Sequence, residues 1–192
     1  MRIGLLPGLL ITLLLSGLVT TALLQLLVGD LRQVDRLGRW LREHQAGERA
    51  LELVRGELQR AESVRVNTEI SGGCGTSGRT PRLQLSGRDR SGALRTVTYA
   101  AGPAPSTIWR GEVLMRCGPA YGLDGEWSAG EAVSRVLIDA LPGASGFTVS
   151  GSAPGLLSLE LSRELHGGQI ISQRHTALAA AAVQDAGEHQ AR

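Results

Sequence analysis

Residues 3–29 of this chain read IGLLPGLLITLLLSGLVTTALLQLLVG and contain no charged side chain. A helix rises 1.5 Å per residue, so about 27 helical residues extend for about 40 Å, and about 20 suffice to cross a bilayer. Charged residues begin at Asp30, and no proline occurs between Pro7 and Pro81. The stretch therefore predicts one long helix, with residues 1–29 as a membrane anchor and residues 30–63 as an amphipathic stalk.

A cleavable signal peptide is the alternative interpretation of the same stretch. Arg2 precedes an apolar segment, Leu5–Leu15, and small residues follow at Thr20–Ala22, as they do before a signal peptidase site. Apolar residues nevertheless continue to Val28, well beyond the usual apolar part of a signal peptide. An anchor that remains on the chain is therefore the first prediction.

The stalk carries a single apolar stripe. Its apolar residues recur at steps of three and four, the spacing of one helix face, in two runs: Leu31, Val34, Leu37 and Leu41, then Leu51, Val54, Leu58 and Ala61. Polar residues at His44, Gln45 and Glu48 interrupt the stripe between the two runs. We expect residues 5–62 to form one nearly continuous helix whose second half packs on a sheet, with Leu51, Val54 and Leu58 in the core.

Glycines recur every nine residues along this helix, at Gly29, Gly38, Gly47 and Gly56. Nine residues make two and a half turns, so successive glycines fall on opposite faces and form no common packing seam. They are predicted to be points of curvature, each costing up to about 1 kcal/mol of helix stability.

Residues 64–178 have the composition and the period of a β-rich head. Most of the 26 glycines lie after Arg65, which indicates many turns, and aromatic residues make up only 3% of the chain, so the core must be aliphatic. Strands are predicted at 64–70, 83–85, 94–99, 107–116, 147–150, 156–161 and 170–178, whereas 133–141 fits a helix or a strand. The expected fold class is α+β, a long N-terminal helix packed on an antiparallel sheet, with a tail (179–192) that is frayed helix or disordered.

Both cysteines, Cys74 and Cys117, lie in this head. In a reducing compartment they would be buried thiols; behind a membrane anchor, in an oxidising compartment, they predict one disulfide. Neither belongs to a CxxC motif or adjoins a histidine, so a metal site is the weakest alternative.

The orientation of the anchor has two conflicting indications. The arginines after the apolar stretch outnumber Arg2 before it, which by the positive-inside rule would place the head in the cytoplasm. The two cysteines, interpreted as a disulfide of an oxidising compartment, instead indicate a head outside the cytoplasm. We expect a single-pass protein of the inner membrane with an extracytoplasmic head.

Composition and motifs exclude several functions. A net charge of +2 with no basic cluster gives no sign of a nucleic-acid partner, and all 20 basic residues are arginine. Ser145 lies in Gly-Ala-Ser-Gly, which predicts a turn, and no nucleotide fingerprint is present. The four histidines, His44, His166, His175 and His189, lack metal-ligand spacing and are predicted to be solvated. The sequence therefore predicts neither an enzyme, nor a metal, nor a cofactor.

Two parts of the chain carry a family likeness. Residues 44–58, HQAGERALELVRGEL, are similar to the Asn-Gly-Arg, Ala-Leu, Asp-Leu pattern that follows the hydrophobic helix of PilW/PulJ-type minor pilins. Residues 114–121, LMRCGPAY, and 136–139, VLID, are similar to a segment of cyanobacterial pilin-like proteins. The chain thus resembles type IV pilin-like proteins over most of residues 4–70 and only weakly over the remaining residues. The resemblance implies that the helix packs among other pilin or pseudopilin subunits, and that a prepilin peptidase is a partner.

The processing motif departs from that family, in which the peptidase cuts after a glycine and the fifth residue beyond the cut is usually Glu. If Gly4 precedes the cut, the mature chain begins at Leu5, and Leu9 takes the fifth place. If Pro7 is aligned with the proline that often precedes the Glu, Gly8 takes the place of the Glu.

In either alignment the family's carboxylate is missing. In the family that carboxylate is thought to neutralise the amino terminus of a neighbouring subunit inside the apolar filament core, where an unpaired charge is costly. We therefore expect poor or absent cleavage, and an initiating or tip-proximal position if the chain assembles.

Calcium is a further possibility that the resemblance raises, because some pilin-like heads bind it. Asp124, Glu126 and Asp139 are the candidate ligands, although the Asp124-Gly125 pair is more simply a turn.

Two functions follow as hypotheses. The first is a minor pilin or pseudopilin, a structural or assembly-initiating component of a type IV pilus or a type II-like secretion system. The second is a single-pass membrane-anchored extracytoplasmic binding domain that does not polymerise.

Overall fold

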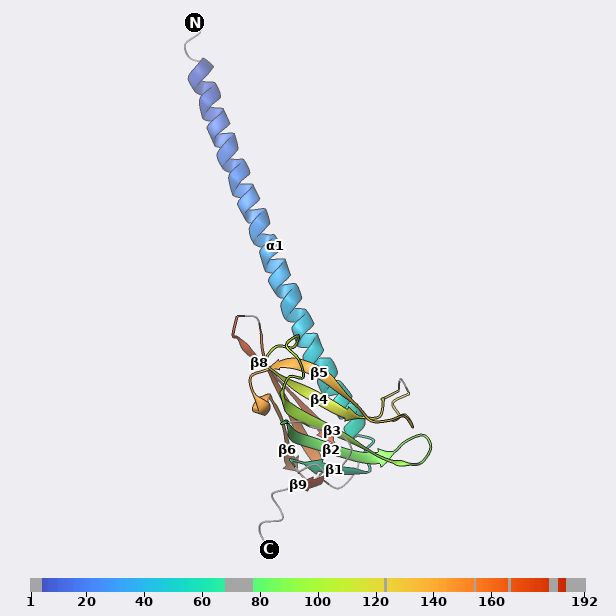
Figure 1. Ribbon diagram of the computed structural model, residues 1–192. Helices are drawn as coiled ribbons and strands as arrows, with labels where there is room; N and C mark the ends of the chain where they lie inside the picture. Colours follow the sequence, from blue (N-terminus) through green and yellow to red (C-terminus); the bar gives the residue numbers. More distant parts are fainter. Residues whose placement is uncertain are drawn as a thin grey trace. The chain divides into compact units, whose positions relative to one another are not determined.

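The computed structural model describes residues 5–67, 78–122, 124–153, 155–165, 167–179 and 183–185. The chain divides into two compact units, residues 1–43 and 44–192. One helix, α1 (Leu5–Leu58), continues through the boundary without a break (Figure 1). The boundary falls inside the predicted stalk rather than at its first charged residue, and α1 ends four residues before the predicted 62.

The first unit contains a segment, Leu13–Asp30, that is long and apolar enough to cross a membrane. The large apolar side chains whose burial is described are exposed, from 45% for Val28 to 71% for Leu14. The hydroxyls of Thr20 and Thr21 donate to the carbonyls of Ser16 and Gly17, each at 2.7 Å. These two polar groups are therefore satisfied within the helix, as an apolar surrounding requires.

The second unit combines the end of α1 with two sheets, where one antiparallel sheet was expected. The larger sheet has the strand order β5-β4-β3-β2-β1-β9, and the smaller one has the order β6-β7-β8. The larger sheet is built from β1 (Ser63–Val66), β2 (Thr80–Arg88), β3 (Leu94–Pro103), β4 (Glu112–Gly118), β5 (Val133–Leu141) and β9 (Val183–Asp185), of which β1 to β5 lie side by side in Figure 1. The smaller sheet is built from β6 (Phe147–Ala153), β7 (Leu156–Glu164) and β8 (Ile170–Leu178), and a short 3-10 turn, η1 (Ala144–Gly146), precedes it.

All strand pairs in the described residues are antiparallel except one. β9 pairs with β1 in parallel, with Val64 opposite Val183 and Val66 opposite Asp185. This corrects the prediction that the tail from 179 is frayed helix or disordered, because part of it completes the edge of a sheet. Residues 107–111, the first part of an expected strand, form a connection instead, and 133–141 is a strand rather than a helix.

One hydrophobic core joins the end of α1 to both sheets. Leu51, Val54 and Leu58 are fully buried in a cluster with Leu85 of β2, Leu114 of β4 and apolar side chains of β6 and β7. In β7 burial alternates along the strand, with Leu157, Leu159 and Leu161 inward, which is the pattern of a strand with one buried face.

The stripe of α1 is buried only in part. Ala50 and Leu51 are buried, whereas Val34, Leu37 and Leu41 are 66%, 57% and 43% exposed. Among the residues of α1 whose burial is described, Gly47 is the first that is buried.

Candidate functional site

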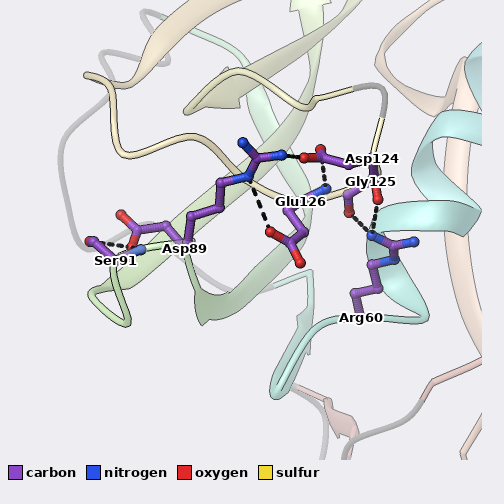
Figure 2. Close-up of polar contacts among 7 residues, drawn as sticks. Arg60, Asp89, Ser91, Asp124, Gly125 and Glu126 are labelled. Atoms are coloured by element: carbon purple, nitrogen blue, oxygen red, sulfur yellow. Dashed lines mark hydrogen bonds and ion pairs between the residues drawn. The ribbon is translucent and has the colours of Figure 1, made fainter.

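A polar pocket of about 490 Å³ opens where the end of α1, the β2–β3 turn and the β4–β5 loop meet. Figure 2 shows its side chains converging from these three segments. The pocket is lined by Arg60, Arg88, Asp89, Arg90, Gly125, Glu126 and Trp127. The lining thus brings three guanidinium groups and two carboxylates together in one hollow.

The β2–β3 turn is held by the side chain of Asp89. Its Oδ1 accepts from the backbone N–H of Ser91 at 2.8 Å and of Ala93 at 3.1 Å, and its Oδ2 accepts from Nε of Arg95 at 2.7 Å. The hydrogen bond from the Ser91 hydroxyl, followed by that from Arg95, holds the pKa of Asp89 well below its usual value. Both oxygens are engaged and the side chain is fully buried, so the role of Asp89 is to fix the turn that presents Arg88 and Arg90.

The β4–β5 loop is held by two arginines. Arg90 donates through Nε to Oε2 of Glu126 at 3.2 Å and pairs through Nη2 with the carboxylate of Asp124. Arg60, just past the end of α1, donates to the backbone carbonyls of Asp124 and Gly125. The loop is thereby connected both to the helix end and to the β2–β3 turn.

The loop itself is a tight turn around Gly125. Its φ of 75° lies in the left-handed region, which glycine adopts without strain, and its N–H donates to the carbonyl of Gly122 at 2.9 Å. Trp127 is 5% exposed and packs over Gly87 of β2, where an added Cβ would lie 3.0 Å from its ring. The Asp124-Gly125 pair is therefore a turn anchored by arginines.

The three acidic residues weighed as calcium ligands do not meet. Asp124 and Glu126 face Arg90, whereas Asp139 of β5 accepts from the N–H of Arg110 at 3.1 Å and lies 3.5 Å from Nη2 of Arg163. Within the residues that the structure describes, no group of three or more His, Cys, Asp and Glu side chains is placed to hold a metal ion.

A second polar cluster is buried between α1 and the larger sheet. Glu57 is fully buried, and its carboxylate accepts from Arg116 of β4, with Nη2 to Oε1 at 2.6 Å and Nε to Oε2 at 3.2 Å. The Tyr99 hydroxyl of β3 donates to Oε2 of Glu57, and Nη2 of Arg116 also donates to the carbonyl of Pro119 at 2.7 Å. Burial, and then the charge of Glu57, raises the pKa of Tyr99 well above its ordinary value.

The geometry of this cluster indicates a structural role. All its charges are compensated in the described residues, and Glu57, Tyr99 and Arg116 are 5% exposed or less, so none can reach a ligand in solvent. Its effect is to fix which face of α1 meets β3 and β4, because a sliding or rotated helix would leave Arg116 unpaired in the interior.

A third cluster joins the start of the head-packed helix to β8. The carboxylate of Glu48 lies 2.7 Å from Nε2 of His175, and because a carboxylate only accepts, His175 carries its proton on Nε2. Nε2 of Gln173 donates to Oε1 of Glu48 at 2.9 Å and to the carbonyl of His44 at 3.0 Å. His44 and His175 are thus engaged between α1 and β8, which corrects the expectation that they are simply solvated.

Gly47 lies against this third cluster and has a packing role that the nine-residue spacing conceals. A Cβ added to Gly47 would lie 1.9 Å from Oε1 of Gln173, so the amide fills the space that a side chain would need. Gly56 is also in close contact, with Tyr121 Oη 3.3 Å from an added Cβ. The prediction that these glycines are only points of curvature is wrong for Gly47, whose missing side chain admits Gln173.

Several residues singled out from the sequence cannot be placed as predicted. Cys117 is buried in β4, but Cys74 lies outside the described residues, so the Cys74–Cys117 disulfide stays a prediction. Gly4, His166 and His189 also lie outside them. Leu5, Gly8 and Leu9 belong to the first turns of α1, and Ser145 belongs to η1.

Sequence reasoning missed Glu57, Arg116 and Gln173, although a signal for them exists. Ala50, Val54, Glu57 and Ala61 follow steps of four, three and four, so Glu57 falls on the apolar face of the helix. Arg116 and Gln173 occupy inward positions of β4 and β8. A polar residue at an inward position of two separate elements is the pattern of a buried polar pair.

Comparison of the chain with protein-family models, with curated proteins and with solved structures gave no match.

Proposed function

We propose that this chain is a minor pilin or pseudopilin, a structural or assembly-initiating subunit of a type IV pilus or a type II-like secretion system. The observation that carries the proposal is α1. It is a single helix, Leu5–Leu58, with an apolar segment long enough for a membrane at one end and a last part buried in an α+β head. A subunit of such a filament needs both parts in one helix.

The absent carboxylate gives the proposed subunit a particular position. Gly8 and Leu9 occupy the places at which the family's Glu is expected, and no acidic residue precedes Asp30. A subunit in the middle of a filament would leave a neighbour's charged amino terminus unpaired in an apolar core, which is costly. A subunit at the tip has no such neighbour, so we place this chain at or near the tip.

The head supplies no chemistry for catalysis in this proposal. The carboxylates of Asp89, Asp124 and Glu126 are all held by arginines, and the described pocket presents no nucleophile paired with a base. The polar pocket and its arginine-held loop serve instead as a recognition surface.

The test is the mature N-terminus of the native protein, determined by mass spectrometry on purified membranes and on sheared surface filaments. We expect an uncleaved or poorly cleaved chain, present in filaments at low abundance and enriched at their ends. A chain that begins at an N-methylated Leu5 and is abundant along the filament would overturn the tip position. A chain found only in membranes, with no filament association, would overturn the pilin proposal itself.

A Gly8→Glu variant sharpens this test. If the missing carboxylate limits incorporation, restoring it should increase the amount of the protein in sheared filaments, whereas Gly17→Glu, a matched glycine deeper in the apolar segment, should not. Equal incorporation of both variants would show that the carboxylate position is irrelevant.

The second candidate is an anchored binding domain that never polymerises, and the polar pocket favours it. A hollow of about 490 Å³ with three arginines is large enough to receive a small polar ligand or a loop of a partner. Retention in the membrane fraction, with loss of partner binding in Arg88→Ala or Arg90→Ala, would select this candidate over the first.

A further inference from the structure

The larger sheet ends at β9, a strand of three residues from the last part of the chain (Figure 1). β1 lies between β2, with which it pairs antiparallel, and β9, with which it pairs in parallel. The register places Val64 opposite Val183 and Val66 opposite Asp185. β9 therefore covers the long edge of β1 that β2 leaves free, and we call this edge the β1 edge.

The β1 edge borders the hydrophobic core of the head. Val64 and Val66 are fully buried members of the core cluster, and Val183 is partly buried and packs against the same cluster. A strand edge that combines unpaired main-chain N–H and C=O groups with alternating apolar side chains pairs readily with a strand of another chain. Without β9, the β1 edge would combine both features.

β9 itself has the properties of a protected edge. It is only three residues long, and its sequence, Val-Gln-Asp, ends in a charged residue. Short edge strands and charged edge residues are two of the means by which sheets avoid pairing with other chains. The sheet therefore ends in a strand that favours pairing less than β1 would.

The attachment of β9 depends on the residues before it. Ordering three residues costs about as much free energy as their few main-chain hydrogen bonds return, so β9 would not stay on β1 as a separate peptide. The N–H of Ala179 donates to the carbonyl of Gly155, next to β7, at 2.8 Å, and only residues 180–182 separate Ala179 from Val183. This short connection keeps β9 close to the β1 edge and raises its local concentration there.

We propose that β9 is a guard strand, which prevents the β1 edge of one head from pairing with the β1 edge of a second copy. A second copy is the partner to be excluded because two copies present the same edge, and two identical edges can meet around a twofold axis and satisfy each other's main-chain groups. Copies anchored in one membrane also meet at raised local concentration, which favours such pairing. The inference concerns the head, and it holds whether or not the chain assembles into a filament.

The experiment compares the full chain in detergent with two truncations. One truncation ends at Ala179 and lacks β9, whereas the other ends at Asp185 and keeps it. We expect the Ala179 truncation to speed amide hydrogen exchange in residues 62–67 by about tenfold or more, while β2 to β4 stay protected. Sedimentation should show more dimer than for the full chain. The Asp185 truncation should behave like the full chain.

Photo-crosslinking identifies the surface through which the dimer forms. A benzophenone amino acid is placed at Arg65, which lies opposite Gln184 of β9. Without β9 it should give a product that contains two differently tagged copies, crosslinked within residues 62–67 of the second copy. With β9 present, the same position should react within its own chain.

A point substitution opens the guard strand without shortening the chain. Val183→Asp places a carboxylate against the apolar cluster, which is costly, so it should raise both the exchange of residues 62–67 and the proportion of dimer. Val183→Ile is the matched control, because it keeps an apolar β-branched side chain, and it should change neither quantity.

Four results would overturn the inference. If residues 62–67 stay protected without β9, the β1 edge does not depend on it. If they exchange faster but the proportion of dimer does not rise, the exposed edge does not pair. Faster exchange throughout the head, in the Ala179 truncation and in Val183→Asp alike, would make β9 a part of the core and not a guard. Equal dimer formation by the Asp185 truncation would assign the effect to residues 186–192.

Discussion

Arg116 and Glu57 form a buried ion pair in which Nη2 of the arginine lies 2.6 Å from Oε1 of the glutamate, with side chains 6% and 0% exposed. The pair joins β4 to α1 across 59 positions of the sequence. Removing two charges from water costs several kcal/mol for each ion, and only close contacts with full hydrogen bonding offset that cost. The Tyr99 hydroxyl and the Pro119 carbonyl complete the hydrogen bonding of this pair.

Breaking this pair from one side should be strongly destabilising. Glu57→Leu leaves Arg116 buried without a counter-charge and should lower the free energy of unfolding by about 3–5 kcal/mol. Replacing both partners, Glu57→Leu with Arg116→Met, should restore most of that loss, because no buried charge remains. Urea unfolding of the full chain in detergent, followed by tryptophan fluorescence, measures both changes. Glu52→Leu is the control, since the Glu52 side chain is 66% exposed, and an equal loss there would show that the pairing is not the cause.

Tyr99 of the same cluster should make the stability of the head decrease at alkaline pH. The pKa of Tyr99 is raised in the folded protein, while an unfolded tyrosine loses its proton near pH 10. The stabilisation is therefore fully present below about pH 10, and the free energy of unfolding should fall above it by up to about 1.4 kcal/mol per pH unit. Unfolding curves between about pH 9 and pH 11 measure this slope, which should be smaller in Tyr99→Phe. An unchanged slope in that variant would show that other groups cause the loss of stability at alkaline pH.

The buried face of α1 is tested by two substitutions three residues apart. Leu58→Ala should lower the free energy of unfolding by about 2–5 kcal/mol, because the side chain is fully buried in the core. Arg55→Ala should change it by about 0.5 kcal/mol or less, because this side chain is 43% exposed and pairs with the exposed Glu52. Similar losses from both substitutions would contradict the assignment of the face.

Gly47 and Gln173 should be coupled in a double-mutant cycle. Gly47→Ala alone places a Cβ where Oε1 of Gln173 now lies, so the amide must leave its contacts with Glu48 and His44, and stability should fall. In a Gln173→Ala background the space is empty, and Gly47→Ala should instead stabilise the helix by up to about 1 kcal/mol. Urea unfolding of the four proteins of the cycle checks this reversal of sign, and additive effects would refute the contact.

The disulfide between Cys74 and Cys117 remains the prediction made from their number and compartment. Closing a loop of about 44 residues should stabilise the head by about 4 kcal/mol at most. Thiol labelling of the denatured, unreduced protein should find no reactive cysteine. Labelling of both cysteines in a sample kept oxidising throughout would disprove the bond.

The sequence alone determined the features that have a local period. No charged residue occurs between Ile3 and Gly29 and no proline occurs between Pro7 and Pro81, so a single helix through Leu58 with an apolar first part could be predicted from the sequence. Leu51, Val54 and Leu58 follow the helical period, and Leu157, Leu159 and Leu161 follow the strand period. The buried face of each element can therefore be predicted from a few consecutive residues. The fold class followed from these periods.

Only the tertiary structure decided with which partners the buried polar residues pair. Glu57 meets Arg116 59 positions away, and Glu48 meets His175 127 positions away, and neither separation leaves a trace in a local pattern. The three-residue strand β9 also depends on the tertiary structure, because it pairs with the edge strand β1. So does the packing role of Gly47, because Gln173 of β8 lies where its Cβ would be. Periodicity reports how an element faces a core, whereas partners depend on which elements the completed fold brings together. Burial without a partner is costly for a polar group. Polar residues can therefore be buried at these positions only because the assembled fold supplies their partners.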